Sequence, residues 1–141
     1  MANAQAAMKW NSMVETGVTA TFSDAQTAEP IAYFTTETDA AYLVTAKVVA
    51  VATDNWDEVN TYIFAGTFEN DGGTLTQTST TTDIHTKEGH AGWACTFAVS
   101  SPDVRVVFTT DDTTPVTVRT VLEVIPVRKK APHLYGTSTN A

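Results

Sequence analysis

The pattern of apolar and polar residues between positions 93 and 127 predicts three antiparallel strands. Apolar side chains recur at every second position in three runs, and short turns rich in Asp, Pro and Thr separate these runs. A period of two places successive side chains on opposite faces of a sheet, which is typical of antiparallel sheet that packs on one side only. The three apolar sets are Trp93, Cys95, Phe97 and Val99; Val104, Val106 and Phe108; and Val116, Val118, Leu122 and Val124.

Earlier segments of the chain continue this pattern. Strands are expected at 17–23, 29–35, 41–52 and 59–69, with a weaker one at 74–80. Gly72-Gly73 marks a tight turn, because glycine adopts positive φ without strain. The polar residues 81–92 are expected to form an exposed loop. About eight strands of regular spacing predict an all-β fold, an eight-stranded antiparallel β-sandwich of jelly-roll type.

The composition supports this fold class and divides the chain into three parts. The 141 residues include 27 threonines, whose stiff β-branched side chains suit strands better than helices. We expect an N-terminal arm at 1–16, one β-sandwich domain at 17–127 and a C-terminal tail at 128–141. The arm carries Trp10, which must either fold back onto the domain or meet a partner.

The charge restricts the classes of partner. A net charge of −8 repels phosphate backbones, so general nucleic-acid binding is not expected. Three of the eight cations gather at 128–130, which indicates either a solvated tail or a basic extension that docks on an acidic neighbour. The sequence contains no apolar signal core and no run long enough to span a bilayer, so we expect a soluble protein made in the cytoplasm.

Candidate chemical groups are few. Cys95 is the only cysteine and lies on an apolar face, where it is expected to be a buried hydrophobe. His85 and His90 lack the further ligands of a zinc site, and the acidic turn 53–58 lacks the order of an EF-hand. Nucleophile-elbow, P-loop and dinucleotide motifs are also missing, so we expect no metal, no cofactor and no enzymatic activity.

Trp56 stands out within the acidic turn DNWDE. An exposed Trp on a loop can stack on a sugar or anchor an interface. The alternative is that Trp56 folds over the open end of the sandwich.

Residues 29–127 resemble a β-domain that recurs in tailed-phage virion proteins. The shared features are an alternating apolar strand, an aromatic-rich strand, a Gly-Gly turn and three closing strands; Arg119-Thr120 stand where the pattern has Trp-Thr. The matching residues are Tyr42, Val44, Ala46, Val48, Val49, Ala50, Tyr62, Phe64, Gly72, Gly73, Trp93, Phe97, Val104, Arg105, Val106, Glu123 and Val124. The resemblance implies a virion component of a fibre, a tail tip or the capsid surface.

Two functions follow from these observations. The first is a capsid decoration (cement) protein on the outer capsid surface, with the major capsid protein and further copies of itself as partners, a trimer by resemblance. Its contacts would come from the arm and the tail, through Met8, Trp10, Met13, Arg128, Lys129, Lys130, Leu134 and Tyr135. The alternative is a fibre or tail-associated module that binds a carbohydrate or receptor through Trp56; a start at Met1 without a repetitive shaft favours the first function.

Overall fold

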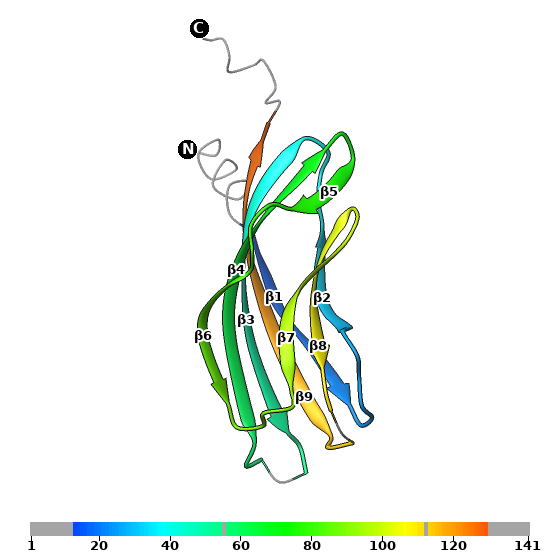
Figure 1. Ribbon diagram of the computed structural model, residues 1–141, viewed down its shortest axis with the longest axis vertical. Coiled ribbons are helices and arrows are strands. Elements are labelled where there is room, and N and C mark those ends of the chain that lie inside the picture. The colour runs from blue at the N-terminus through cyan, green and yellow to red at the C-terminus, as the bar shows by residue number, and fades with distance from the viewer. Residues whose placement is uncertain (1–12, 55, 112, 130–141) are drawn as a thin grey trace, which may run out of the picture.

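Two antiparallel sheets face each other in a computed structural model, which describes residues 13–54, 56–111 and 113–129 (Figure 1). The described residues form nine strands, β1 (Met13–Phe22), β2 (Glu29–Thr35), β3 (Ala40–Ala52), β4 (Val59–Asp71), β5 (Thr74–Gln77), β6 (Thr82–Glu88), β7 (Ala94–Ser100), β8 (Asp103–Thr109) and β9 (Val116–Arg128). The prediction of an all-β sandwich is confirmed. Within the described ranges no helix is long and apolar enough to cross a membrane.

The larger sheet has the strand order β1-β9-β3-β4, and two short strands share the free edge of β4. β5 pairs with Phe68–Asp71 of β4, and β6 pairs with Asn60–Ala65. The smaller sheet has the order β2-β8-β7. Every pairing is antiparallel, so chain direction reverses from each strand to its neighbour.

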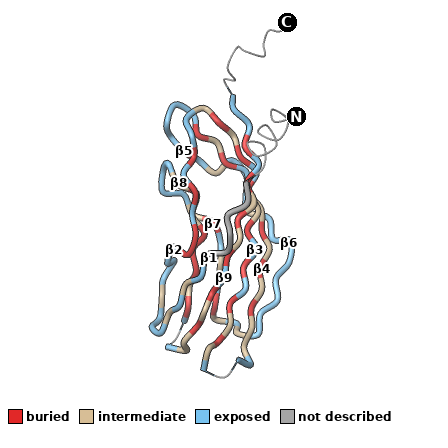
Figure 2. The backbone as a smooth tube through the Cα atoms, turned by 180° about the vertical axis from the view of Figure 1, so that it is seen from behind, coloured by how far each residue is buried: buried red, intermediate tan, exposed pale blue. Residues whose placement is uncertain are grey.

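The core lies between the sheets and consists of the apolar faces that the alternation predicts. Buried and exposed positions alternate along β3, β4 and β9 (Figure 2). Phe97 of β7 meets Phe64 and Phe68 of β4 edge to face, with ring centroids 4.7 and 5.2 Å apart. Such pairs stabilise a core beyond the burial of their area. Two predicted core residues of β7 depart from this pattern, since Val99 is exposed and Cys95 is only partly buried against the core.

The prediction of a loop at 81–92 is wrong for Thr82–Glu88, which forms β6. All seven residues of β6 are exposed, so β6 buries no side chain and shows no apolar alternation. Its position comes from backbone pairing with β4 along one side. A strand held in this way leaves no hydrophobic pattern in the sequence.

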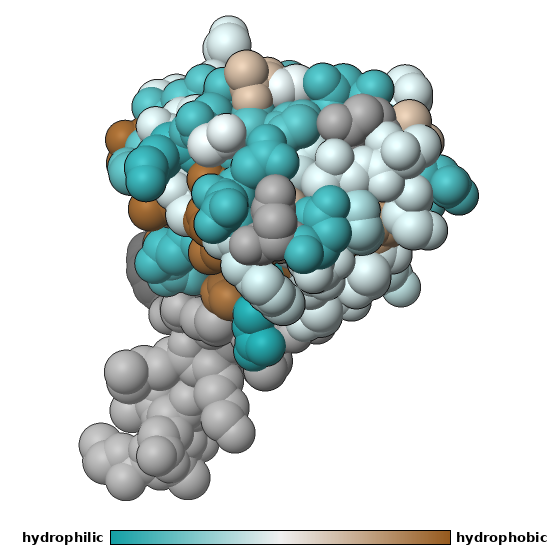
Figure 3. Space-filling model, turned by 90° about the horizontal axis from the view of Figure 1, so that it is seen from below, coloured by the Kyte–Doolittle hydropathy of each residue, from teal (hydrophilic) through white to brown (hydrophobic). Residues whose placement is uncertain are grey.

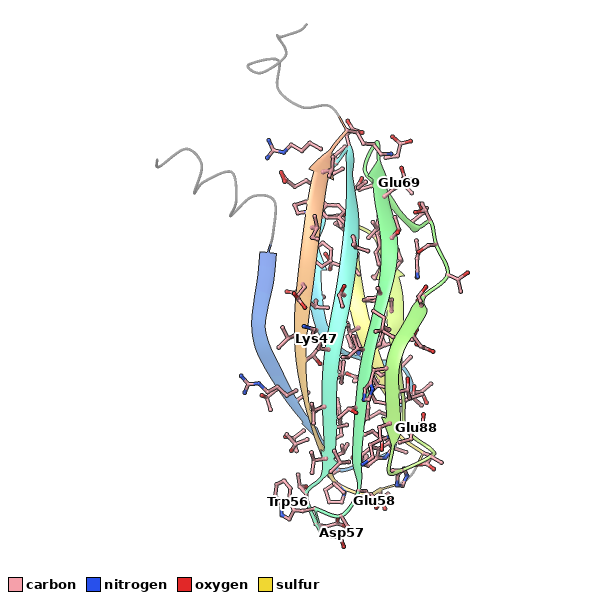
Figure 4. All side chains as sticks on the ribbon, turned by 90° about the vertical axis from the view of Figure 1, so that its left-hand side faces the viewer. Lys47, Trp56, Asp57, Glu58, Glu69 and Glu88 are labelled. Atoms are coloured by element: carbon pink, nitrogen blue, oxygen red, sulfur yellow. The ribbon has the colours of Figure 1, made fainter. Side chains whose placement is uncertain are left out.

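The outer face of the larger sheet is more apolar than the sequence pattern suggested. Lys47 of β3 forms an ion pair with Glu123 of β9 at 2.7 Å near the middle of this face (Figure 4). Around that pair, the exposed large apolar residues of the two strands are Leu43, Val49, Ile125 and Val127. The run 41–52 is therefore apolar on both faces of its strand.

The two ends of the described chain leave the sandwich together. Met13 at the start of β1 pairs with Val124 near the end of β9, so the start of β1 and the end of β9 lie toward the same end of the molecule (Figure 1). Strand β1 thus begins within the predicted arm, and Arg128 of the predicted tail is the last residue of β9. At the opposite end the chain turns through 23–28, 53–58, 89–93 and 110–115, and we call these four loops the distal end.

Candidate functional site at the distal end

The distal end is acidic. Its four loops contain six Asp or Glu residues and no Lys or Arg, so His90 is their one candidate cation by sequence. Viewed from below, this end of the molecule is largely hydrophilic, with apolar residues toward one side (Figure 3). A surface of this charge disfavours anionic ligands.

Trp56 projects from the tip of the β3–β4 loop at this end (Figure 4). Its side chain is 65% exposed, so it does not fold over the open end of the sandwich. Its φ of 62° lies in the left-handed region, which is unfavourable for a bulky residue. The backbone N–H of Trp56 donates to the carbonyl of Ala52 at 3.1 Å, which fixes this turn. A strained, exposed aromatic residue is a candidate contact for a ligand.

His90 joins two neighbouring loops. Its Nδ1 lies 2.5 Å from Oε2 of Glu58 in the β3–β4 loop, and its Nε2 lies 2.9 Å from Oδ1 of Asp111 in the β8–β9 loop. The imidazole also stacks on the buried ring of Trp93, with centroids 4.6 Å apart and planes at 24°. The side chain is only 14% exposed, so these contacts surround most of it.

Ionisable partners control the charge of this cluster. Burial alone would lower the pKa of His90, but hydrogen bonds to Asp111 and Glu58, together with their charges, raise the pKa above its usual 6.5. The hydrogen bond from His90 lowers the pKa of Asp111 below its usual 3.8. The arrangement therefore favours an imidazolium between two carboxylates.

Asn60 and Tyr62 of β4 hold the backbone of the 89–93 loop. The side chain of Asn60 is fully buried; its Oδ1 accepts from the N–H of His90 and its Nδ2 donates to the carbonyl of His90, both at 2.8 Å. Nδ2 also donates to the hydroxyl of Tyr62 at 2.8 Å, and that hydroxyl donates to the carbonyl of Trp93 at 3.2 Å. Burial raises the pKa of Tyr62 to about 12, so Tyr62 stays neutral.

Glycine permits the close contact between two of these loops. A Cβ built on Gly92 would lie 1.7 Å from Oδ2 and 2.0 Å from Cγ of Asp111. Asp111 can therefore reach His90 only while position 92 lacks a side chain. The β3–β4 and β8–β9 loops also touch directly, since the N–H of Thr53 donates to the carbonyl of Pro115 at 2.8 Å.

Three of the eight predicted partner-binding residues, Met13, Arg128 and Lys129, are described, and they lie away from the distal end. Arg128 approaches Glu37 at 3.5 Å and Lys129 approaches Glu69 at 2.6 Å. Met13 begins β1, while Met8, Trp10, Lys130, Leu134 and Tyr135 lie outside the described residues. Their role as partner contacts stays a prediction.

The remaining candidate groups are not brought together as a metal centre. His85 on β6 contacts the hydroxyl of Thr61 at 3.0 Å, away from His90. Among the described residues no group of three or more His, Cys, Asp or Glu is placed to hold a metal ion. Burial raises the pKa of the Cys95 thiol to about 12, which is unsuited to a thiolate nucleophile.

Glu58 and Asp111 form a pair of carboxylates, as glycoside hydrolysis requires. A general acid in such a pair needs a raised pKa so that it holds a proton at neutral pH. The pKa of Asp111 is lowered instead, and both carboxylates bind the His90 ring. The described geometry therefore suits ligand contact and loop positioning better than proton transfer by Asp111.

Comparison with known proteins relates the fold to phage tailspikes. No protein-family model matches the chain, and no curated protein matches it. The tailspike protein of Acinetobacter baumannii phage AM24 is structurally similar, with a TM-score of 0.51 at 8% identity over 89% of this chain. Two further neighbours are the tailspike of Acinetobacter baumannii phage Fri1, a capsular polysaccharide depolymerase (TM-score 0.42, 11% identity, 83% of this chain), and that of Acinetobacter phage vB_ApiP_P1 (TM-score 0.34, 16% identity, 86% of this chain).

These neighbours are much longer than this chain. It spans 28% of the AM24 tailspike, 20% of the Fri1 tailspike and 22% of the vB_ApiP_P1 tailspike. The likeness at 8% identity shows a shared fold. The expectation of a non-enzymatic class is contradicted by one structural neighbour, since the Fri1 tailspike is a capsular polysaccharide depolymerase. That activity is a property of the whole Fri1 protein.

Proposed function

We propose that this chain forms a β-sandwich module of a tail-associated phage virion protein and that its distal end contacts a carbohydrate receptor. The fold supports the first part, because it recurs in a phage tailspike over 89% of this chain. The observation that carries the second part is Trp56, which is 65% exposed at φ 62° on the tip of a distal loop. Aromatic faces of this kind stack on sugar rings.

The charge of the distal end narrows the class of carbohydrate. Its loops carry six acidic residues and no Lys or Arg, so an acidic polysaccharide would be repelled. Neutral sugars, or sugars with a free amine, fit this surface. Asp54 lies two residues before Trp56 in the same loop and is exposed, so its carboxylate can accept hydrogen bonds from sugar hydroxyl or amine donors.

This proposal takes the alternative of the two functions expected from the sequence. A cement role on the capsid surface, with the major capsid protein as partner and a trimeric state, stays a prediction, and the fold comparison favours tail-associated proteins. The start of β1 and the end of β9 lie toward the end of the sandwich opposite the distal loops (Figure 1). That geometry suits a module whose loops face outward from the virion.

Binding of the full chain to neutral, amine-bearing and acidic bacterial polysaccharides tests the proposal. Replacing Trp56 with Ala should weaken binding by about thirtyfold, which corresponds to the ~2 kcal/mol of a central aromatic contact. The matched control is Tyr33→Ala, because Tyr33 is also an exposed aromatic but lies on β2, outside the distal loops. Equal losses in both variants, or binding by none of the proteins, would contradict the proposal. Reducing ends released from each polysaccharide should be measured in parallel, since one neighbour is a depolymerase.

A further inference from the structure

We propose that His90 is a protonation-dependent staple that joins the β3–β4, β6–β7 and β8–β9 loops and thereby sets the arrangement of the distal end. This inference deepens the proposed function by giving the binding end a dependence on pH. It starts from geometry, since both ring nitrogens of His90 face a carboxylate oxygen, at 2.5 and 2.9 Å.

The hydrogen-bond chemistry of the two partners fixes the charge state of this arrangement. An ionised carboxylate only accepts hydrogen bonds, so each ring nitrogen must carry a proton to donate. An imidazole with both nitrogens protonated is an imidazolium. When the ring loses one proton, one ring nitrogen can no longer donate and faces a carboxylate oxygen that can only accept. That hydrogen bond is lost, and the loop that carries this carboxylate loses its contact with His90.

The surroundings identify the bond that breaks first. Asp111 is the more exposed partner, at 51% against 31% for Glu58, and its contact is the longer of the two. The neutral ring therefore keeps its proton on Nδ1 for Glu58 and gives up the bond to Asp111. Release of Asp111 removes one contact of the 110–115 loop, which stays bonded to Gln26 through Thr110 and to Thr53 of the β3–β4 loop through Pro115. The β3–β4 loop carries Trp56 at its tip.

The other groups that face His90 keep the ring in place and do not titrate with it. Asn60 is neutral and binds the His90 backbone, the Tyr62 pKa of about 12 keeps that hydroxyl protonated, and the apolar face of Trp93 covers one side of the imidazole. Stacking on an indole also favours the cationic ring. Among the described residues, the pH response is therefore assigned to the His90 ring and its hydrogen bonds to Glu58 and Asp111.

The test combines two NMR titrations of the full chain. Imidazole resonances report the protonation of His90, and ¹⁹F resonances of fluorotryptophan, assigned with Trp56→Phe, report the β3–β4 loop. We expect the Trp56 resonance to shift with the same midpoint as His90, above the usual 6.5. In Asp111→Asn and in Glu58→Gln the titration midpoint of His90 should fall. Each unit by which it falls corresponds to an about tenfold lower affinity of the ring for its proton.

A matched histidine variant separates the staple from general effects of pH. His90→Gln should abolish the titration of the Trp56 resonance, whereas His85→Gln, on the exposed β6 strand, should leave it unchanged. Persistence of the Trp56 titration in His90→Gln would overturn the inference, and so would a His90 midpoint that Asp111→Asn and Glu58→Gln leave unmoved. If His90→Gln does not fold, the two carboxylate variants decide the outcome. Carbohydrate binding is measured separately. If no carbohydrate binds but the His90 and Trp56 resonances titrate with the same midpoint, the proposed function is overturned and the role of His90 is retained.

Discussion

Asn60 binds His90 through both backbone groups of that residue, as a neighbouring strand would. Each of the two hydrogen bonds is 2.8 Å long, and the Asn60 side chain is fully buried. Asn60 occupies a position of β4 at which the alternation places a buried side chain. Its amide therefore gives the backbone of the 89–93 loop the two hydrogen bonds that a neighbouring strand would otherwise supply. The Asn60 amide thus links the core of the sandwich to the cluster of His90, Glu58 and Asp111 at the distal end.

Replacing Asn60 with Ala should destabilise the protein by about 2–4 kcal/mol, because the backbone groups of His90 and the Tyr62 hydroxyl lose buried partners. Urea unfolding measures this loss. Asn70→Ala is the matched control, since Asn70 is equally buried and bonds Thr36 and Gly73 at the other end of β4. Both variants should lose stability, but only Asn60→Ala should move the Trp56 resonance. A Trp56 signal unchanged by Asn60→Ala would separate Asn60 from the loops.

The stability that His90 contributes should be greatest in mildly acidic solution. The His90 pKa is raised in the folded state, so its contribution is complete below the usual 6.5 and disappears as pH rises through the folded pKa. The Asp111 pKa is lowered, so its contribution is complete above 3.8 and is lost as pH falls through the folded pKa. The difference in melting temperature between wild type and His90→Gln should therefore peak between these two values. A difference that stays constant from acidic to alkaline pH is the contrary result.

Gly92→Ala should break the contact between His90 and Asp111. The new Cβ would overlap the Asp111 carboxylate, so that side chain must turn away. We expect the His90 pKa to fall, as NMR titration would show, because the ring loses the hydrogen bond and the charge of Asp111. Ala91→Ser, at an exposed neighbouring position, is the control and should leave the His90 titration unchanged. An unchanged His90 pKa in Gly92→Ala would show that the loop tolerates the added methyl group.

Trp56→Asn should stabilise the protein while it removes the proposed sugar contact. Asn tolerates positive φ better than Trp, and the gain should be somewhat under 1 kcal/mol. Thermal unfolding measures it. Ile84→Asn is the control, because Ile84 is equally exposed on β6 and is not among the residues with positive φ. No gain in Trp56→Asn would mean that the indole makes stabilising contacts in the folded protein.

Cys95 should react very slowly with thiol reagents in the folded protein. A pKa of about 12, against the ordinary 9.0, lowers the thiolate fraction at neutral pH by about a thousandfold. Because Cys95 is the only cysteine, the release of a chromogenic thiol measures it directly, and reaction after unfolding in urea provides the control. Rapid reaction of the native protein would contradict burial of this side chain.

Apolar alternation made most of the fold predictable. The core faces of β3, β4, β8 and β9 follow from it, because burial between two sheets acts on every second side chain. β6 could not be found in this way, since it buries nothing and depends on backbone hydrogen bonds that any sequence can form. The apolar outer positions of β3 and β9, such as Leu43 and Ile125, carry no sequence signal that distinguishes them from core.

The distal cluster was only partly visible in the sequence. The sequence places Glu58 in an acidic turn and His90 in a separate polar segment and rejects a metal site in each, yet the two residues act together with Asp111 across 32 and 21 residues of chain. Strand order brings them together, and one sequence does not reveal strand order. One usable signal was Asn60, a polar residue at a position where the alternation of β4 requires an apolar one.

The shared exit of β1 and β9 has a consequence for how such a module can be reused. Met13 at the start of β1 and Arg128 at the end of β9 both lie toward the end opposite the distal loops. The sandwich can therefore be joined to a longer polypeptide through two neighbouring attachment points. Such an insertion would interrupt the longer polypeptide at a single place, and the sandwich would keep the hydrogen bonds of its distal end.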